Sequence, residues 1–236
     1  MTTEAAKGKV AVITGGFGGI GGATRALLAS QGFIAASLDR QADPADPLQY
    51  RCDIADLDEL VATLARVEAE HGLIEVLVNN AGVFHNTALF DLTPALYDRT
   101  FAVNVRAMFF ASQHVARRLV DSGRGGAIVN VASAAGRTGS PYVDYGASKA
   151  AVIGLTQSLG KALAVHGIRV NAVAPGQVVT GMHRSLDPER QKFNLGLIPM
   201  KRSGEPGELA SVIAFLAGDG ASFMTSAIVD VNGGKL

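Results

Sequence analysis

The stretch VAVITGGFGGIGGATRAL, residues 10–27, joins an apolar β-branched run, a turn with many glycines and a helix-forming segment. Its glycines fit two registers: Gly16, Gly18 and Gly21 match GxGxxG, whereas Gly15, Gly19 and Gly21 match TGxxxGxG. In both registers the missing side chains let backbone N–H groups approach a phosphate at the N-terminus of the helix. The stretch therefore predicts a strand, a phosphate-binding turn and a helix.

Outward from this stretch, short apolar runs alternate with segments long enough to be helices. The runs are FIAASL (33–38), the short QYRCD (49–53), IEVLVN (74–79), AIVNVA (127–132), RVNAVA (169–174) and AIVDVN (227–232). They are apolar without interruption, as strands are when helices cover both faces of a sheet. The pattern predicts an α/β fold with a doubly wound, Rossmann-type parallel sheet of about seven strands, and residues 1–236 as one domain.

The composition favours a small-molecule ligand over nucleic acid or a membrane. The chain has 21 basic and 21 acidic side chains among 236 residues, so no net field attracts a polyanion. No uncharged apolar run reaches the length of about 18 residues that a membrane helix needs, and residues 1–10 lack the apolar core of a signal peptide. The single cysteine, Cys52, has no partner for an internal disulfide and no metal-ligand spacing around it. We expect a cytoplasmic protein without a metal.

Two helical segments, 100–119 and 145–165, are apolar nearly all the way round. A helix that lies on a sheet needs only one apolar stripe, so the remaining apolar surface needs another cover. A second copy of the chain is the simplest cover, and the sequence predicts a homo-oligomer that packs through these segments.

The chemistry-bearing motif is YGASK, in which Tyr145 and Lys149 stand four residues apart on one face of a helix. A cation beside a phenol stabilises the phenolate, and this brings the tyrosine pKa closer to working pH. Such a pair can move a proton on an alcohol oxygen.

The order of motifs identifies a family. TGxxxGxG at 14–21 is followed by NNAG at 79–82, Asn104, Ser133, Tyr145 with Lys149, and Pro175-Gly176. Along nearly the whole chain this order resembles the short-chain dehydrogenase/reductase family. The resemblance favours the TGxxxGxG register, and it implies a tetramer as the form of the homo-oligomer.

The resemblance implies a catalytic role for four residues. Tyr145 is expected to donate or accept the substrate proton, and Lys149 to lower the pKa of Tyr145 and to hold the nicotinamide ribose. Ser133 is expected to hydrogen-bond the substrate oxygen. Asn104 is expected to hold a water that links Lys149 to solvent.

The resemblance also implies NAD as the cofactor. The acidic residue that follows the glycines by about 20 positions is Asp39, whose carboxylate would accept from the adenosine ribose hydroxyls and repel a 2′-phosphate. Family members that prefer NADP usually carry a basic residue where this chain has Gly18. Arg40 leaves NADP open, because a guanidinium there could pair with a 2′-phosphate.

The other cofactor contacts follow the family's motifs. Expected around the phosphates, adenosine and nicotinamide are Gly15, Phe17, Gly19, Ile20, Gly21, Asp53, Ile54, Asn80, Ala81, Gly82, Tyr145, Lys149, Pro175, Gly176, Val178 and Thr180. Two positions depart from the family pattern: Phe17 replaces a small residue, and Ser226 stands where a glycine is usual.

The predicted activity is hydride transfer between NAD(H) and a secondary alcohol or ketone. An alternative is an NADPH-dependent reductase of 3-oxoacyl thioesters, against which Asp39 and Gly18 count. A further alternative, the epimerase and dehydratase branch of the family, normally has TGxxGxxG and a longer C-terminal lobe than this chain. A noncatalytic NAD-binding regulator usually lacks one of the four catalytic residues, all of which are present here.

The substrate itself stays open among a polyol, a cyclic alcohol, a hydroxy acid and a thioester. Three segments are expected to decide it, namely 83–92, 134–144 and a substrate loop at about 181–198. Met182, Leu186, Phe193 and Leu197 are candidate apolar lining, and His85, His183 and Arg184 are left without an assigned role.

Overall fold

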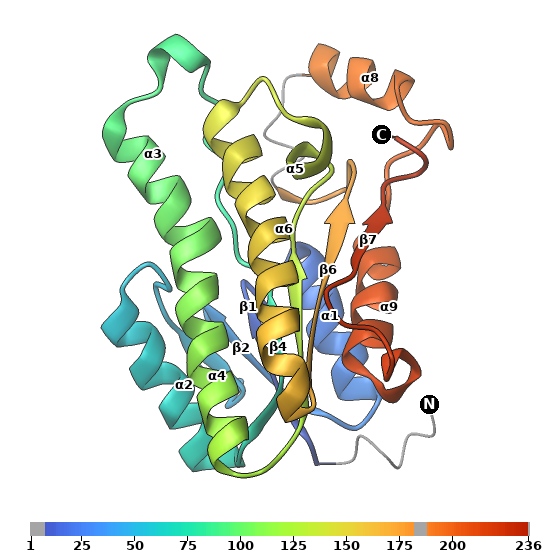
Figure 1. Ribbon diagram of the computed structural model, residues 1–236. Helices are drawn as coiled ribbons and strands as arrows, with labels where there is room; N and C mark the ends of the chain where they lie inside the picture. The colour runs from blue at the N-terminus through green and yellow to red at the C-terminus, as the bar shows by residue number, and fades with distance from the viewer. Residues whose placement is uncertain (1–7, 182–187, 236) are drawn as a thin grey trace.

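Seven parallel strands form one sheet in a computed structural model, which describes residues 8–181 and 188–235. The strand order is β3-β2-β1-β4-β5-β6-β7, a Rossmann-type topology (Figure 1). The strands are β1 (Val10–Thr14), β2 (Ile34–Asp39), β3 (Gln49–Arg51), β4 (Ile74–Asn79), β5 (Gly126–Val131), β6 (Ile168–Pro175) and β7 (Ile228–Val231). The predicted α/β fold and its parallel sheet are confirmed.

Helices cover both faces of the sheet. The long helices are α1 (Gly19–Ser30), α2 (Leu57–His71), α4 (Met108–Asp121), α6 (Val143–Leu163) and α9 (Pro206–Ala217). Helices α1 and α9 pack against each other and against β1, β2, β5 and β6, while α2, α4 and α6 contact the sheet from its other side. The shorter elements are η1 (Leu89–Asp91), α3 (Pro94–Phe101), η2 (Ala102–Ala107), α5 (Ala135–Thr138), η3 (Ala164–His166), α8 (Pro188–Gly196) and η4 (Asp219–Ala221).

The alternation of side chains along β1 explains why its apolar run is continuous. Val10 and Val12 belong to the core beneath α2 and α4, and Ala11 and Ile13 belong to the core beneath α1 and α9. Successive side chains of a strand point to opposite faces, so a sheet that is buried on both faces needs an apolar residue at every position. The physical reason for the sequence pattern is therefore the two-sided burial.

The predicted helix at 100–119 is not continuous. Helix α3 ends at Phe101, a π-helical turn (η2) spans Ala102–Ala107, and α4 begins at Met108. Within the turn, the Asn104 amide accepts from Val83 N at 2.8 Å and donates to Val83 O at 3.1 Å. These two bonds pull one residue out of the regular helix toward the chain segment after β4, and π-helical turns of this kind often mark functional sites.

Ser226, the second departure from the family pattern, has a φ of 62°. This left-handed conformation strains a residue with a side chain and favours glycine, which explains the usual glycine at this position. The chain holds the serine by two hydrogen bonds, from Ser226 N to Val170 O at 2.7 Å and from Ser226 Oγ to Gln157 O at 3.2 Å.

The strand order reverses direction between β1 and β4, and this reversal places the site. Helices after β1 and after β4 leave on opposite faces of the sheet, so a crevice opens at the carboxyl ends of these two strands. Among the described residues, no helix is both long and apolar enough to span a membrane.

Candidate active site

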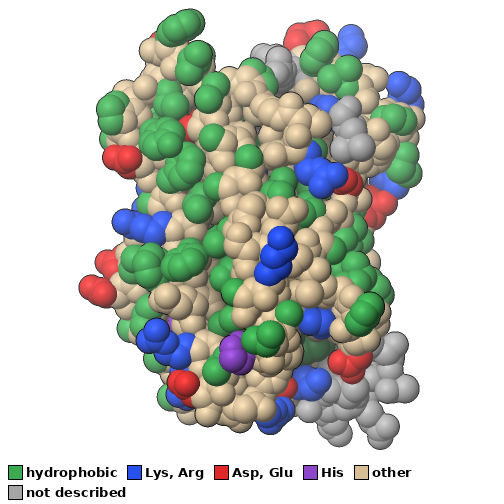
Figure 2. All heavy atoms as spheres, viewed as in Figure 1, with side chains coloured by type: hydrophobic (Ala, Val, Ile, Leu, Met, Phe, Trp, Pro, Cys, Tyr) green, Lys and Arg blue, Asp and Glu red, His purple; other side chains and the backbone are tan. Residues whose placement is uncertain are grey.

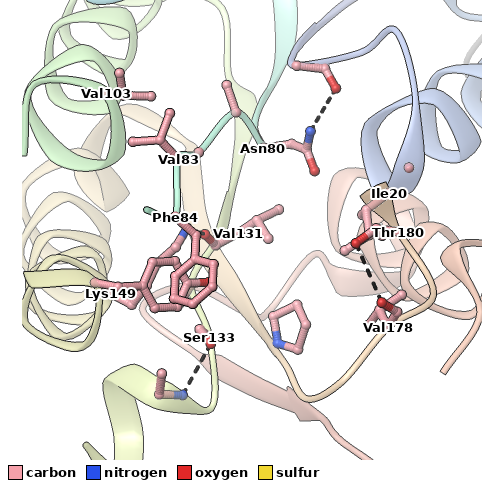
Figure 3. A pocket seen from close by; sticks show the side chains of 18 of the residues that line it. Ile20, Asn80, Val83, Phe84, Val103, Val131, Ser133, Lys149, Val178 and Thr180 are labelled. Atoms are coloured by element: carbon pink, nitrogen blue, oxygen red, sulfur yellow. Dashed lines mark hydrogen bonds between the residues drawn. The ribbon is translucent and has the colours of Figure 1, made fainter. Parts of the chain in front are cut away.

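A cavity of about 920 Å³ lies at the carboxyl ends of the parallel strands. Its wall comes from the glycine turn after β1, from the ends of β2, β4, β5 and β6, and from residues of α5 and α6. Figure 3 shows Phe84, Ser133 and Lys149 together at one side, with Ile20, Val178 and Thr180 across from them. Volume and position suit an extended ligand at the switch point of the sheet.

The glycine turn has the geometry of the TGxxxGxG register. Gly15 and Gly19 have φ values of 67° and 57°, which L-residues with side chains rarely adopt. A Cβ on Gly21 would overlap Gly15 O, whereas a Cβ on Gly18 would meet no atom within 4 Å. Gly18 precedes the first residue of α1 with its backbone extended. The turn thus presents a helix N-terminus without side chains, which fits a pyrophosphate.

Asp39, at the end of β2, stands beside this turn. Its Oδ2 accepts from Phe17 N at 3.2 Å and its Oδ1 accepts from Gln41 N at 3.1 Å. Both bonds orient the carboxylate at the cavity wall, where Phe17 and Arg40 also lie. Carboxylate oxygens keep further lone pairs, so Asp39 can still accept from the hydroxyls of a ribose.

Asp53 and Ile54 lie on the same side of the cavity. Both carboxylate oxygens of Asp53 accept from Arg99 Nη2, at 3.2 and 3.0 Å. Burial by itself raises the pKa of Asp53, but the Ala55 N–H and the Arg99 guanidinium hold that pKa below its ordinary value. We call this part of the cavity, with Asp39, Arg40, Asp53 and Arg99, the ribose end.

Asn80 ties the end of β4 to the glycine turn. Its Nδ2 donates to Thr14 O at 3.0 Å and to Gly15 O at 2.9 Å. The next two residues, Ala81 and Gly82, line the cavity, and a Cβ on Gly82 would come within 3.3 Å of Asn104 Oδ1 and 3.5 Å of Lys149 Nζ. The NNAG segment therefore forms the part of the cavity wall between the glycine turn and Lys149.

Ser133, Tyr145 and Lys149 meet at the opposite end, which we call the reacting end. Ser133 follows β5, and its Oγ accepts from Ala135 N at 3.1 Å. Lys149 Nζ lies 5.8 Å from the centre of the Tyr145 ring and donates to Val131 O at 2.8 Å. The spacing of four residues on α6 thus brings the ammonium and the phenol to one side of the helix, as the sequence predicts.

The electrostatics of this end differ from the expectation for Tyr145. Burial raises the pKa of the Tyr145 phenol, and the hydrogen bond from Ser133 only partly lowers it. Burial also lowers the pKa of Lys149 to about 8, because the residue is only 3% exposed and desolvation disfavours its charged form. In the chain alone, desolvation therefore sets the direction of the shift in the Tyr145 pKa, and the lowering of that pKa by Lys149 stays a prediction.

Two predicted residues do not line the cavity, Asn104 and Gly21. Asn104 is fully buried and donates from Nδ2 to Ser148 Oγ at 3.0 Å, in addition to its two bonds with Val83. Its side chain joins the NNAG segment to α6. Gly21 lies behind the turn, where its lack of a side chain permits close packing against Gly15 and Asn80.

The segment after β6 forms the last wall. Pro175, Gly176, Val178 and Thr180 line the cavity as predicted, and backbone bonds to Gly204 hold the segment in place. Gln177 lines it too, and its buried Oε1 accepts no hydrogen bond from the residues that the structure describes. An acceptor without a donor at this wall fits a carboxamide N–H, such as that of nicotinamide. Sequence analysis missed Gln177, although it follows the Pro-Gly motif directly.

Phe84 and Tyr142 line the reacting end. They fall in the segments 83–92 and 134–144 that the sequence predicts to decide the substrate, but neither residue is singled out there. The available signal was their position, since they stand two residues after NNAG and three before Tyr145. From α8 it is Asn194 that reaches the wall, whereas Phe193 and Leu197 are 59% and 50% exposed and do not. His85 does not line the cavity either. Met182, His183, Arg184 and Leu186 of the expected substrate loop lie outside the described residues.

Comparisons with known proteins agree with this geometry. A family model described as Enoyl-(Acyl carrier protein) reductase matches residues 18–235. The chain is 37% identical to 3-oxoacyl-(acyl-carrier-protein) reductase FabG of Thermotoga maritima, over 97% of this chain and 98% of that one. It is also 37% identical to the uncharacterized oxidoreductase YgfF of Escherichia coli, over 96% of this chain and 99% of that one. A FabG reductase of the same name from Staphylococcus aureus is 35% identical over 96% of this chain and 97% of its own.

Proposed function

Because the chain belongs to the short-chain dehydrogenase/reductase family of oxidoreductases, we propose that it transfers a hydride between NAD(H) and a secondary alcohol or ketone. The observation that carries the proposal is the convergence of Ser133, Tyr145 and Lys149 at one end of a cavity whose other end holds the glycine turn. When bound, NAD accepts or supplies a hydride at the nicotinamide ring.

In this proposal the chain's own residues handle the proton. Tyr145 takes the hydroxyl proton during oxidation and returns it to the oxygen during reduction. Ser133 donates a hydrogen bond to the same oxygen and so polarises it. Lys149 holds the ribose hydroxyls and places a cation beside the phenol. A cation beside a phenol favours the phenolate, and so acts against the desolvation that raises the pKa of Tyr145.

Asn104 acts in the proposal by positioning other groups. Its bonds to Val83 and Ser148 hold the NNAG segment against α6, so the wall beside Lys149 keeps its shape. The water relay predicted for Asn104 stays a prediction.

The choice of NAD rests on Asp39. A carboxylate held by Phe17 N and Gln41 N can accept from ribose hydroxyls and repels a 2′-phosphate. Arg40 lies at the same wall and its charge lowers the pKa of Asp53, so this cation already has a carboxylate within electrostatic reach. Both observations support NAD over NADP.

The test is the appearance of reduced-nicotinamide absorbance with NAD or NADP and a panel of secondary alcohols. We expect turnover with NAD, and a kcat/KM at least about tenfold lower with NADP because of the like charges at Asp39. Absence of turnover with every alcohol and both cofactors would overturn the proposed reaction. Faster turnover with NADP would overturn the assignment of Asp39 and leave the reaction in place.

A second candidate is the reduction of 3-oxoacyl thioesters, which the names of two of the similar proteins support. The same site can reduce any ketone that reaches Tyr145, so the two candidates differ in substrate and cofactor only. Acetoacetyl-coenzyme A with NADH and with NADPH distinguishes them. A kcat/KM for this thioester with NADPH that exceeds that of every alcohol with NAD would favour the second candidate.

We also propose a homotetramer that packs through η2, α4 and α6. Figure 2 shows hydrophobic side chains over the α3 and α4 side of the molecule and mostly small, uncharged groups along α6. Exposed apolar side chains on this side include Tyr97, Val120 and Val143 at 44%, 38% and 45%. Light scattering after size-exclusion chromatography tests the state, and a monomer at micromolar concentration would contradict it.

A further inference from the structure

Phe84 lies against the reacting tyrosine itself. Its ring centre is 5.1 Å from that of Tyr145 and 4.8 Å from that of Tyr142, with interplanar angles of 72° and 88°. Edge-to-face pairs of this geometry are attractive and hold the rings in place. Figure 3 shows Phe84 beside Lys149 and Ser133, so this ring stands where a substrate oxygen would arrive. The three rings form an aromatic wall of the reacting end.

The lining next to this wall is uncharged. From the segment between Ser133 and Tyr145, the cavity receives the apolar residues Ala134 and Pro141 and the neutral hydroxyls of Thr138 and Ser140. The segment's one basic residue, Arg137, does not line the cavity, and its Nη2 lies 3.1 Å from Asp230 Oδ2. The carboxylates that line the described part of the cavity, Asp39 and Asp53, belong to the ribose end. A polyol would meet neutral hydroxyls here, but none of the carboxylates of the described cavity.

One described cation besides Lys149 belongs to this side of the cavity. Lys235 lines it, and its backbone N–H donates to Asn232 O at 3.3 Å, next to Gly176. The carboxylate of a hydroxy acid could pair with this ammonium. Hydroxy acids are therefore the rival substrate class that the test has to separate from apolar alcohols.

We propose that Phe84 and Tyr142 determine specificity, and that they select a secondary alcohol or ketone whose reacting carbon carries an aryl or other apolar ring. The inference rests on the proposed function, because it names the substrate class of the same site. A flat apolar substituent gains contact area and edge-to-face geometry from the two rings, whereas a hydroxylated substituent placed against the Phe84 ring loses water there without a hydrogen bond in exchange.

The test compares substrates that differ only in this substituent. 1-Phenylethanol and 2-propanol share the reacting carbon and differ by a phenyl against a methyl group; sorbitol and 3-hydroxybutyrate represent the rival classes. For the full chain with NAD we expect the highest kcat/KM with 1-phenylethanol. In Phe84→Ala and Tyr142→Ala the ratio of kcat/KM for 1-phenylethanol to that for 2-propanol should fall by about tenfold or more. General damage to Tyr145 affects both alcohols and cancels in this ratio.

Two further variants sharpen the test. Phe84→Leu keeps apolar volume and loses the ring, so the ratio should fall by less than in Phe84→Ala. Leu197→Ala, at a position that does not line the cavity, should leave the ratio unchanged. Saturation-transfer NMR with acetophenone supplies a readout that needs no turnover: its aromatic protons should receive saturation from the wild type and lose most of it with Phe84→Ala.

The outcomes separate this inference from the proposed reaction. A wild type that turns over but prefers sorbitol or 3-hydroxybutyrate, or an unchanged ratio in both alanine variants, overturns the aromatic wall and leaves hydride transfer standing. Saturation transfer that depends on Phe84 without turnover of any alcohol overturns hydride transfer and supports the wall.

Discussion

The ribose end of the cavity is built from charged side chains that stay partly open to water, whereas the reacting end buries its polar groups among apolar and aromatic ones. At the ribose end, the side chains of Asp53 and Arg99 are 38% and 34% exposed. At the reacting end, Lys149 is 3% exposed. One cavity thus contains two electrostatic environments.

The two environments fit the roles proposed for the two ends, which are cofactor recognition and proton transfer. Water screens the charged side chains at the ribose end. These side chains can therefore favour one ligand over another at a small cost in folding free energy. At the reacting end, burial shifts pKa values in opposite directions, raising that of Tyr145 and lowering that of Lys149. Both shifts disfavour the charged forms of the two groups. The pKa values of the phenol and the ammonium should therefore change strongly when a ligand binds beside them. Substitutions at this end should therefore have much larger effects than substitutions at the ribose end.

The largest effect is expected for Tyr145→Phe, which removes the proton donor and keeps the ring. The kcat should fall by about 10²- to 10⁴-fold, the range of general acid–base catalysis, while the Kd for NADH changes little. Steady-state kinetics and NADH fluorescence titration measure the two quantities. Tyr142→Phe removes a phenol hydroxyl from the same wall and is the matched control. Comparable kcat values for both variants would contradict the assigned role of Tyr145.

The second-largest effect is expected in the free energy of unfolding, which should depend on pH because of Lys149. Its pKa is about 8 in the folded chain and 10.5 ordinarily. Between these values the unfolded chain binds more protons, so the free energy of unfolding rises with pH. From pH ~7 to ~9.5 this rise amounts to about 2 kcal/mol, and Lys149→Met should lack it.

Urea denaturation of the wild type and Lys149→Met at these two pH values measures the difference. Lys161→Met, at an exposed position of the same helix, is the control and should keep the rise. An equal pH dependence in wild type and Lys149→Met would mean that the ammonium is not desolvated, and the contrast between the two ends would be lost.

A moderate effect is expected for Asp39→Asn at the ribose end. The substitution removes the charge and keeps the shape, so the preference of kcat/KM for NAD over NADP should fall by about tenfold or more. Kinetics with both cofactors at low and high salt measure this preference. Asp43→Asn, in the exposed loop after β2, should leave it unchanged. An unaltered preference in Asp39→Asn would assign cofactor choice to another residue.

The smallest effect is expected for Arg99→Met, which breaks the ion pair with Asp53. Partly exposed pairs contribute at most about 1 kcal/mol, so stability should change by no more than that and the KM for NAD should rise by about threefold. Thermal unfolding and cofactor kinetics measure both, with the exposed Arg117→Met as control. A loss of activity as large as that of Tyr145→Phe would erase the distinction between the ends.

The sequence predicted much of the fold because its signals are local. Every predicted strand forms within two residues of its expected position, since two-sided burial requires an apolar residue at each place in the strand. The TGxxxGxG register agrees with the backbone at Gly15 and Gly19, because only a residue without a side chain adopts those angles readily. The four-residue spacing of Tyr145 and Lys149 was sufficient to bring them to one side of a helix.

Other features could not be predicted from local patterns. The interruption of the 100–119 helix depends on bonds between Asn104 and Val83, 21 residues apart in the sequence. The wall residues Phe84, Tyr142 and Gln177 come from loops that are far apart in the sequence, so no local pattern predicts that they line one cavity. The cytoplasmic location stays a prediction. The oligomeric state and the catalytic roles stay predictions too, and the light-scattering and kinetic experiments above test them.

The sequence by itself determined a doubly wound parallel sheet, a dinucleotide turn and a phenol–ammonium pair, because each depends on residues that are neighbours in a strand, a turn or a helix. The tertiary structure alone decided the electrostatic state of that pair and the aromatic wall beside it. Both depend on which groups exclude water from Tyr145 and Lys149, and those groups come from β5, the NNAG loop and the segment before α6. Desolvation is a property of the assembled surroundings, and it has no signature in the spacing of residues along the chain.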